Sequence, residues 1–100
     1  MADWYRRRGF RVVARNWRHG RLGEIDIVAL RDDLVVVCEV KTRRSVRFGS
    51  PSEAIDHPKR ERLRRLAAAW LTRHDVRGAR VRFDVAEVCG PRIDVIENAF

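Results

Sequence analysis

Two neighbouring segments decide the fold: Gly23-Glu24-Ile25-Asp26-Ile27-Val28-Ala29-Leu30 and Leu34-Val35-Val36-Val37-Cys38-Glu39-Val40-Lys41-Thr42. Both are rich in the β-branched residues that favour strands, and the polar pair Asp32-Asp33 separates them. The sequence therefore predicts a β-hairpin. Its turn lacks the favoured Asn-Gly or Asp-Gly pair, so the turn type stays open.

Four charged residues stand at the end of this hairpin that lies away from the turn. A turn symmetric about Asp32 and Asp33 places Asp26 opposite Glu39 and Glu24 opposite Lys41, within about 5 Å. Alternation then puts six apolar side chains on the other face: Ile25, Ile27, Ala29, Val36, Cys38 and Val40. The charged face also carries valines and a leucine near the turn, so we expect both faces to be covered.

Carboxylates grouped on an otherwise apolar hairpin are costly to remove from water unless something compensates their charge. A hard divalent cation such as Mg²⁺ would compensate, because it prefers oxygen ligands. A lysine beside the metal could position an attacking water or offset the charge of a phosphate. The alternative is a cross-strand salt-bridge ladder at a wet sheet edge. Spacing alone leaves both open, because one bulge would change the register.

The remaining elements predict the order α-β-β-β-α-β-β within a single domain over residues 1–100. A helix end over 3–8 is closed by Gly9, and a strand follows over 10–16. A capping box at Ser50-Pro51-Ser52-Glu53 predicts a short helix, which Pro58 interrupts or restarts. An amphipathic helix then runs from Lys59 to about His74, long enough to connect parallel strands. Alternating residues predict the last strands, over 81–85 and 92–97.

Composition narrows the class of protein. The 45% hydrophobic content supports a globular fold, and no apolar run is long enough to span a membrane. The chain begins without an apolar signal-peptide core, and its two cysteines form no metal-binding or disulfide pattern, so we expect a cytoplasmic protein. Twenty arginines and two lysines give a net charge of +8, which indicates a polyanionic partner such as nucleic acid. A compositional preference for arginine, with solvated side chains, is the alternative.

Basic residues cluster on both sides of the hairpin. Residues 17–21 are predicted to form a basic loop in which arginines bind phosphate and Trp17 either stacks on a base or packs on the core. A second cluster follows the Glu39-Val40-Lys41 segment. The candidate nucleic-acid contacts are Arg15, Arg18, Arg21, Arg43, Arg44, Arg47 and Lys59.

The ordered pattern of Asp26 followed by Glu39-Val40-Lys41 resembles the signature of PD-(D/E)XK nucleases. A closer resemblance is to the bacterial YraN family, which is itself similar to archaeal Holliday-junction resolvases. It extends over nearly the whole chain, through 15–18, Phe48-Gly49-Ser50-Pro51, Lys59 and the helix after it, Phe83-Asp84-Val85 and Asn98-Ala99-Phe100.

This resemblance implies a restriction-endonuclease-like α/β core with a mixed central sheet flanked by helices. It implies that Asp26 and Glu39 ligate Mg²⁺ or Mn²⁺, that Lys41 is the catalytic lysine, and that Glu24 supports the site. The implied activity is hydrolysis of phosphodiesters in branched or structured DNA. Junction resolvases work as dimers, so a homodimer is implied too, although no self-complementary surface is recognisable in the sequence.

The chain departs from the family pattern in one place. The pattern has a glutamate in the first helix, before the aromatic residues that match Trp4 and Tyr5, whereas Asp3 is the only acid there. We therefore expect either that the N-terminal helix is truncated or that the protein lacks one ligand-supporting carboxylate, and that DNA cleavage is feeble or absent. Three hypotheses stay open: a metal-dependent endonuclease, a nucleic-acid-binding module that has lost cleavage, and a protein whose basic surface binds an acidic protein partner.

Overall fold

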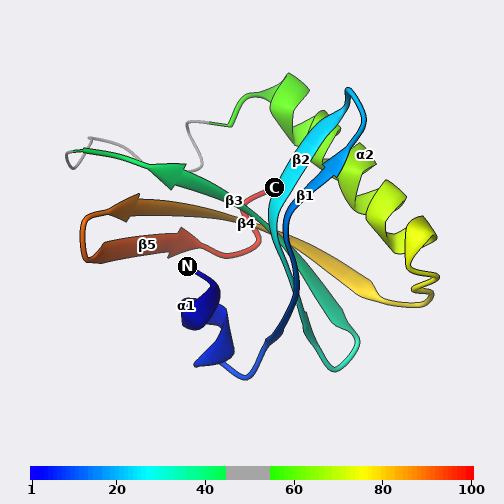
Figure 1. Cartoon of the computed structure of the whole chain (residues 1–100), viewed down its shortest axis with the longest axis horizontal. Coiled ribbons are helices and arrows are strands. Elements are labelled where there is room, and N and C mark those ends of the chain that lie inside the picture. Colours follow the sequence, from blue (N-terminus) through cyan, green and yellow to red (C-terminus); the bar gives the residue numbers. More distant parts are fainter. Residues whose placement is uncertain (45–54) are drawn as a thin grey trace.

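The computed structural model describes residues 1–44 and 55–100. Its elements follow the predicted order: α1 (Ala2–Arg6), β1 (Arg11–His19), β2 (Gly23–Arg31), β3 (Leu34–Thr42), α2 (His57–Arg73), β4 (Arg80–Cys89) and β5 (Arg92–Ile96). The strands form one sheet in the order β1-β2-β3-β4-β5 (Figure 1). Strands β3 and β4 pair in parallel, and the other neighbours pair antiparallel. The prediction of an α/β fold with a mixed sheet is confirmed.

Helix α2 connects the parallel strands and covers one face of the sheet. Asp56 caps its N-terminus by accepting a hydrogen bond from the Lys59 N–H at 3.0 Å. Pro58 lies in the first turn, where its missing N–H costs nothing, so it starts the helix and does not interrupt it. The helix begins two residues before the predicted Lys59. The predicted capping box over 50–53 lies outside the described residues.

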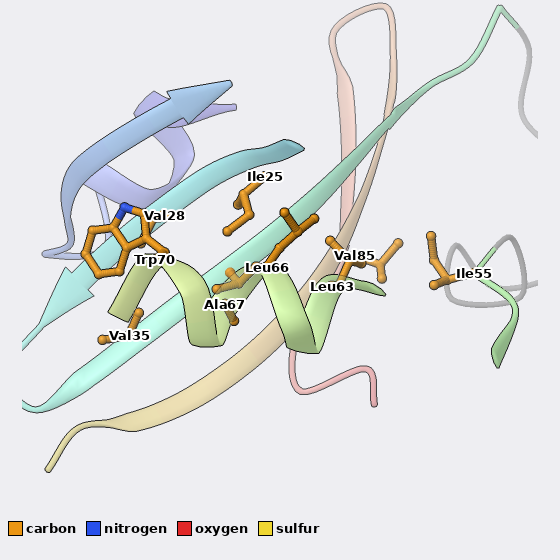
Figure 2. Packing of buried hydrophobic residues seen from close by; sticks show 10 residues of the cluster. Ile25, Val28, Val35, Ile55, Leu63, Leu66, Ala67, Trp70 and Val85 are labelled. Atoms are coloured by element: carbon orange, nitrogen blue, oxygen red, sulfur yellow. The ribbon is translucent and has the colours of Figure 1, made fainter. Parts of the chain in front are cut away.

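Two apolar clusters fill the two sides of the sheet. On the α2 side, Leu63, Leu66, Ala67 and Trp70 point from the helix onto strand residues (Figure 2). On the other side, Tyr5 of α1 and Phe10 pack on a second set of strand residues. These residues are Ile27, Ala29, Leu34, Val36, Cys38 and Ala86. The expected cover on both faces is therefore confirmed, and Cys38 is the fully buried core residue that its position predicts.

The β2–β3 register is confirmed near the turn and ends where the charged residues begin. The pairs run from Arg31↔Leu34 to Ile27↔Cys38, as a turn at Asp32-Asp33 requires. Asp32 takes a positive φ of 53°, a conformation that aspartate tolerates. Beyond this ladder the start of β2 and the end of β3 diverge (Figure 1). Asp26 and Glu39 therefore do not face each other as a strand pair, which corrects the predicted direct opposition of these residues and of Glu24 with Lys41.

Strands β1 and β2 change faces together at the start of this divergence. Ile25 and Val28 are an odd number of residues apart, so alternation would place them on opposite faces, yet both pack under α2. Ala14 and Trp17 of β1 behave in the same way. The change falls at Asn16, whose φ is 51°, between the pairs Arg15↔Ile27 and Trp17↔Ile25. The predicted placement of Ile25 on the same face as Ile27 is therefore wrong, because regular alternation was assumed through a local twist.

Strand β1 is also longer than predicted. It extends to His19 and stays paired with β2 as far as the His19↔Gly23 pair. Residues Trp17 to His19 therefore belong to an edge strand, and only the tip of the predicted basic loop is a turn. Trp17 is half-buried and packs against the α2-side cluster, as expected from the alternative that places it on the core.

Candidate functional site: a charged cavity between diverging strands

The divergence of β2 and β3 opens a cavity of about 350 Å³ beneath the N-terminal part of α2. The cavity is lined by acidic and basic side chains together with a few apolar residues. The charged residues are Arg18, Glu24, Asp26, Glu39, Lys59 and Arg62, and the others are Gly23, Ile55 and Leu63. Asp26 and Glu39 therefore face one space, as predicted, although they reach it from separated strands.

Asp26 lies where β2 and β3 begin to separate, a place that we call the β2–β3 fork. Its Oδ2 accepts a hydrogen bond of 2.7 Å from the backbone N–H of Val40. This side-chain bond links the two strands just beyond the last backbone pair, Ile27↔Cys38. Burial raises the pKa of this carboxyl and the Glu24 charge raises it further, while the Val40 N–H and Lys41 act in the opposite direction. The carboxylate is thus fixed in position and electrostatically unfavourable.

Glu39 has a related environment. Burial raises its pKa, the Asp26 charge adds to the rise, and Lys41 and Arg62 oppose it. The Nζ of Lys41 lies 3.3 Å from Oε1 of Glu39, and both side chains are about one-fifth exposed. Two carboxylates that repel each other in partial burial are residues that could hold a cation.

Arg62 is a cavity residue that the sequence analysis missed. It follows Lys59 by three positions, so both side chains leave the same face of α2 and reach over the carboxylates. Gly23 lies against Arg62, whose Cδ is 3.6 Å from where a Cβ would stand, an ordinary contact distance; glycine is favoured here by its φ of 128°. The spacing of Lys59 and Arg62 relative to the buried Leu63 was the signal that could have identified Arg62.

The other predicted nucleic-acid contacts are scattered around the cavity. Arg15 lines a second cavity of about 280 Å³ on the α1 side, which Asp26 also borders. Arg21 and Arg44 are exposed. Arg43 turns toward Glu87 of β4, with its Nε 3.7 Å from the carboxylate. Arg47 lies outside the described residues.

A buried network around Asp84 was also missed by sequence reasoning. Asp84 is 1% exposed and accepts hydrogen bonds from the Tyr5 hydroxyl at 2.7 Å and from the backbone N–H of Asn98 at 3.0 Å. Arg82 binds both carboxylate oxygens, at 2.9 and 3.0 Å. In the sequence Asp84 was noted only as part of Phe83-Asp84-Val85 in the family resemblance, and its partners Tyr5 and Asn98 lie near the two ends of the chain.

Comparison with known proteins places the chain in a family. The sequence profile of the family described as "Uncharacterised protein family UPF0102" matches residues 1–97. The chain belongs to the UPF0102 family. This is the YraN family that the sequence pattern resembles, so that identification is confirmed.

The UPF0102 relatives are similar along most of their length. A UPF0102 protein of Streptomyces coelicolor is 50% identical, over 91% of this chain and 72% of its own. Those of Paenarthrobacter aurescens and Persephonella marina are 48% and 38% identical, over 87% and 98% of this chain and 71% and 84% of their own. In the part of this UPF0102 protein that the structure describes, no helix is long and apolar enough to cross a membrane.

Proposed function

We propose that this UPF0102 protein is a metal-dependent, endonuclease-like protein that hydrolyses phosphodiester bonds in branched or structured DNA. The observation that carries the proposal is the cavity in the β2–β3 fork. It brings Asp26 and Glu39 together, with Lys41 against Glu39 and with Arg18, Lys59 and Arg62 around them. Acids that can hold a cation, next to bases that can hold a phosphate, are what phosphodiester hydrolysis requires.

The donor set fits Mg²⁺ or Mn²⁺. Asp26 and Glu39 would hold the ion, because both are hard oxygen ligands whose pKa values are raised by burial and by neighbouring carboxylates. When bound, such an ion acts as a Lewis acid on the phosphate and lowers the pKa of a coordinated water. The Val40 N–H fixes Asp26 from one side, and Lys41 fixes Glu39 from the other.

The protein's own groups would bind and orient the substrate. Lys59 and Arg62 reach from α2 and Arg18 from β1, so a phosphate in the cavity would meet cations from two elements. Lys41 is placed to orient the attacking water or to offset the charge that develops on the phosphate. In this step the oxygen of the water bonds to phosphorus, and the bond between phosphorus and the leaving sugar oxygen breaks. Glu24 adds negative charge near Asp26 and would support the cation.

The net charge of +8 supports DNA as the polyanion. Exposed arginines such as Arg21 and Arg44 extend positive charge beyond the cavity, and their contacts with the backbone carry no base information. We expect binding that is largely independent of sequence, in the cytoplasm. A homodimer would provide two such cavities for a branched substrate.

The test is cleavage of four-way-junction, flap, single-stranded and plain duplex DNA with Mn²⁺ present. We expect the wild type to nick at least one substrate, and Asp26→Asn and Lys41→Ala to reduce the rate about a hundredfold or more while DNA binding persists. Asp33→Asn is the matched control, since Asp33 lies in the exposed β2–β3 turn and pairs with Arg80. Calorimetry should show Mn²⁺ binding that Asp26→Asn removes and Asp33→Asn retains.

A specific observation favours a second candidate, a binding module without cleavage. Across residues 1–44 and 55–100, no three histidine, cysteine, aspartate or glutamate side chains are grouped closely enough to form a metal site. Asp3, the acid nearest the family's helix glutamate, is exposed and pairs with Arg6 at 2.9 Å. If the wild type binds all four substrates with a steep salt dependence and cleaves none, the binding-module function replaces the endonuclease function.

A further inference from the structure

Four aromatic rings form a ladder where the end of β1 meets the C-terminal half of α2. The rings of Trp17 and His19 are stacked, with centroids 5.4 Å apart and planes inclined by 12°. Trp17 meets His74 edge-on at 6.4 Å, and His74 stacks on Trp70 at 4.4 Å. His19 is the outermost ring in the sense that it ends the ladder. It is exposed, as is His74, whereas Trp17 is half-buried and Trp70 is buried.

A shallow hollow of about 640 Å³ lies beside this outermost ring. The exposed side of α2 forms the rest of its wall, through Ala68, Ala69, Thr72 and Arg73. The short alanine side chains leave room next to the imidazole, and the Arg73 guanidinium supplies positive charge.

The hollow and the charged cavity of the β2–β3 fork are both bordered by the end of β1. Arg18 lines that cavity and its neighbour His19 lines the hollow, so consecutive residues of one edge strand separate the two spaces. A DNA strand that contacts Arg18 at the end of β1 would therefore also pass close to His19.

We infer that the hollow beside His19 binds an unpaired base of single-stranded DNA, which stacks on the outer face of the His19 ring. Trp17 stacks on the inner face of this ring, and Arg73 would lie beside the sugar-phosphate backbone of the bound strand. Bases within a duplex are already stacked on both sides, so the site selects single strands, flaps or unpaired junction arms. The inference deepens the proposed function and rests on it, since it names the form of DNA that the cavity receives.

The experiment separates stacking from phosphate binding by comparing two ligands of equal length and charge. One is a fluorescently labelled oligothymidylate, and the other is an oligomer of abasic sugar phosphates. Fluorescence anisotropy in buffer with EDTA gives the affinity of each for the wild type, His19→Ala, His19→Phe and His57→Ala. His57 is the matched control because it is an exposed histidine at the opposite end of α2.

For the wild type we expect oligothymidylate to bind about tenfold more tightly than the abasic oligomer, the size of effect that stacking one base provides. This ratio should fall to about one in His19→Ala and stay near tenfold in His57→Ala. His19→Phe should restore it, because phenylalanine retains a ring that can stack. Circular dichroism establishes that each variant is folded.

Equal wild-type affinity for the two oligomers, or a ratio that His19→Ala leaves unchanged, would overturn the inference. Because the measurement contains no metal, it does not depend on cleavage. An inert protein that keeps the His19-dependent ratio contradicts the endonuclease function alone. A protein that cleaves but shows no ratio contradicts the stacking site alone.

Discussion

Asp84 on β4 is buried and Asp26 on β2 is half-buried, and the surroundings of the two carboxylates contrast. Asp84 receives hydrogen bonds from Tyr5, from Arg82 and from the Asn98 backbone. Within the described residues, Asp26 receives one, from the Val40 N–H, and its pKa is raised by burial and by Glu24. The first carboxylate is surrounded by donors, whereas the second borders two cavities.

The difference separates a carboxylate that serves the fold from one that can serve a ligand. The partners of Asp84 come from α1, β4 and the C-terminal segment, so its hydrogen bonds hold parts of the chain together that are far apart in sequence. Asp26 is held at one oxygen, and its remaining hydrogen-bonding capacity faces a space lined with cations. Four experiments can break or sharpen this contrast.

The largest effect should come from Asp84. Asp84→Ala leaves the Arg82 guanidinium and the Tyr5 hydroxyl without their buried partner, so we expect a loss of about 3–5 kcal/mol in the free energy of unfolding. Asp26→Ala should cost far less, because its carboxylate is already unfavourable at neutral pH. Urea unfolding of both variants measures the difference. Equal losses would show that both carboxylates serve the fold.

A smaller effect should follow from Asn16, which lies opposite Asp26 where the strands change faces. Asn16→Val forces a β-branched residue to a φ of 51°, at an expected cost of about 1–3 kcal/mol, whereas Asn16→Gly should be nearly neutral. Asn16→Val should also weaken Mn²⁺ binding, while the Asp84 network persists. Calorimetry and urea unfolding of the pair check this. Tolerance of valine with intact Mn²⁺ binding would contradict a role for this twist.

Lys59 and Arg62 should have a still smaller effect, on DNA affinity. A side chain that neutralises one phosphate of duplex DNA makes the slope of log affinity against log salt concentration more negative by about 0.9. The double variant Lys59→Ala, Arg62→Ala should therefore flatten the slope by up to about 1.8. Arg77→Ala is the control, because Arg77 is exposed, far along the chain, and paired with Asp75. A slope that both variants leave unchanged would remove the cavity cations from the DNA-binding surface.

The smallest effect is a pH dependence of stability in metal-free buffer. The folded-state pKa of Asp26 is raised above its unfolded value of about 3.9, so the folded state binds more protons between the two values. Its unfavourable contribution is absent below about pH 4 and grows as pH rises through the folded pKa. Asp26→Asn should therefore gain stability over the wild type as pH rises from 4 to 7. A constant difference between them would contradict the raised pKa.

The sequence predicted which residues gather at the candidate site better than it predicted how they are arranged. The symmetric Asp32-Asp33 turn predicted the register from Arg31↔Leu34 to Ile27↔Cys38, because the apolar side chains there alternate regularly. The same rule misplaced Ile25 and the opposition of Asp26 with Glu39. Both errors lie beyond a twist at Asn16, and no local pattern in the sequence announces that asparagine as a left-handed residue.

What the sequence by itself determined are the features that depend on near neighbours: the order of elements, the hairpin turn, the buried stripe of α2 and the family pattern of Asp26, Glu39 and Lys41. The tertiary structure alone decided where the strands separate, that Arg62 joins the cavity, and that Asp84 is bound by residues 79 positions away and 14 positions away. The physical reason is range. Propensity, capping and alternation act over a few residues, whereas burial and electrostatics sum over every group that folding brings within a few ångströms.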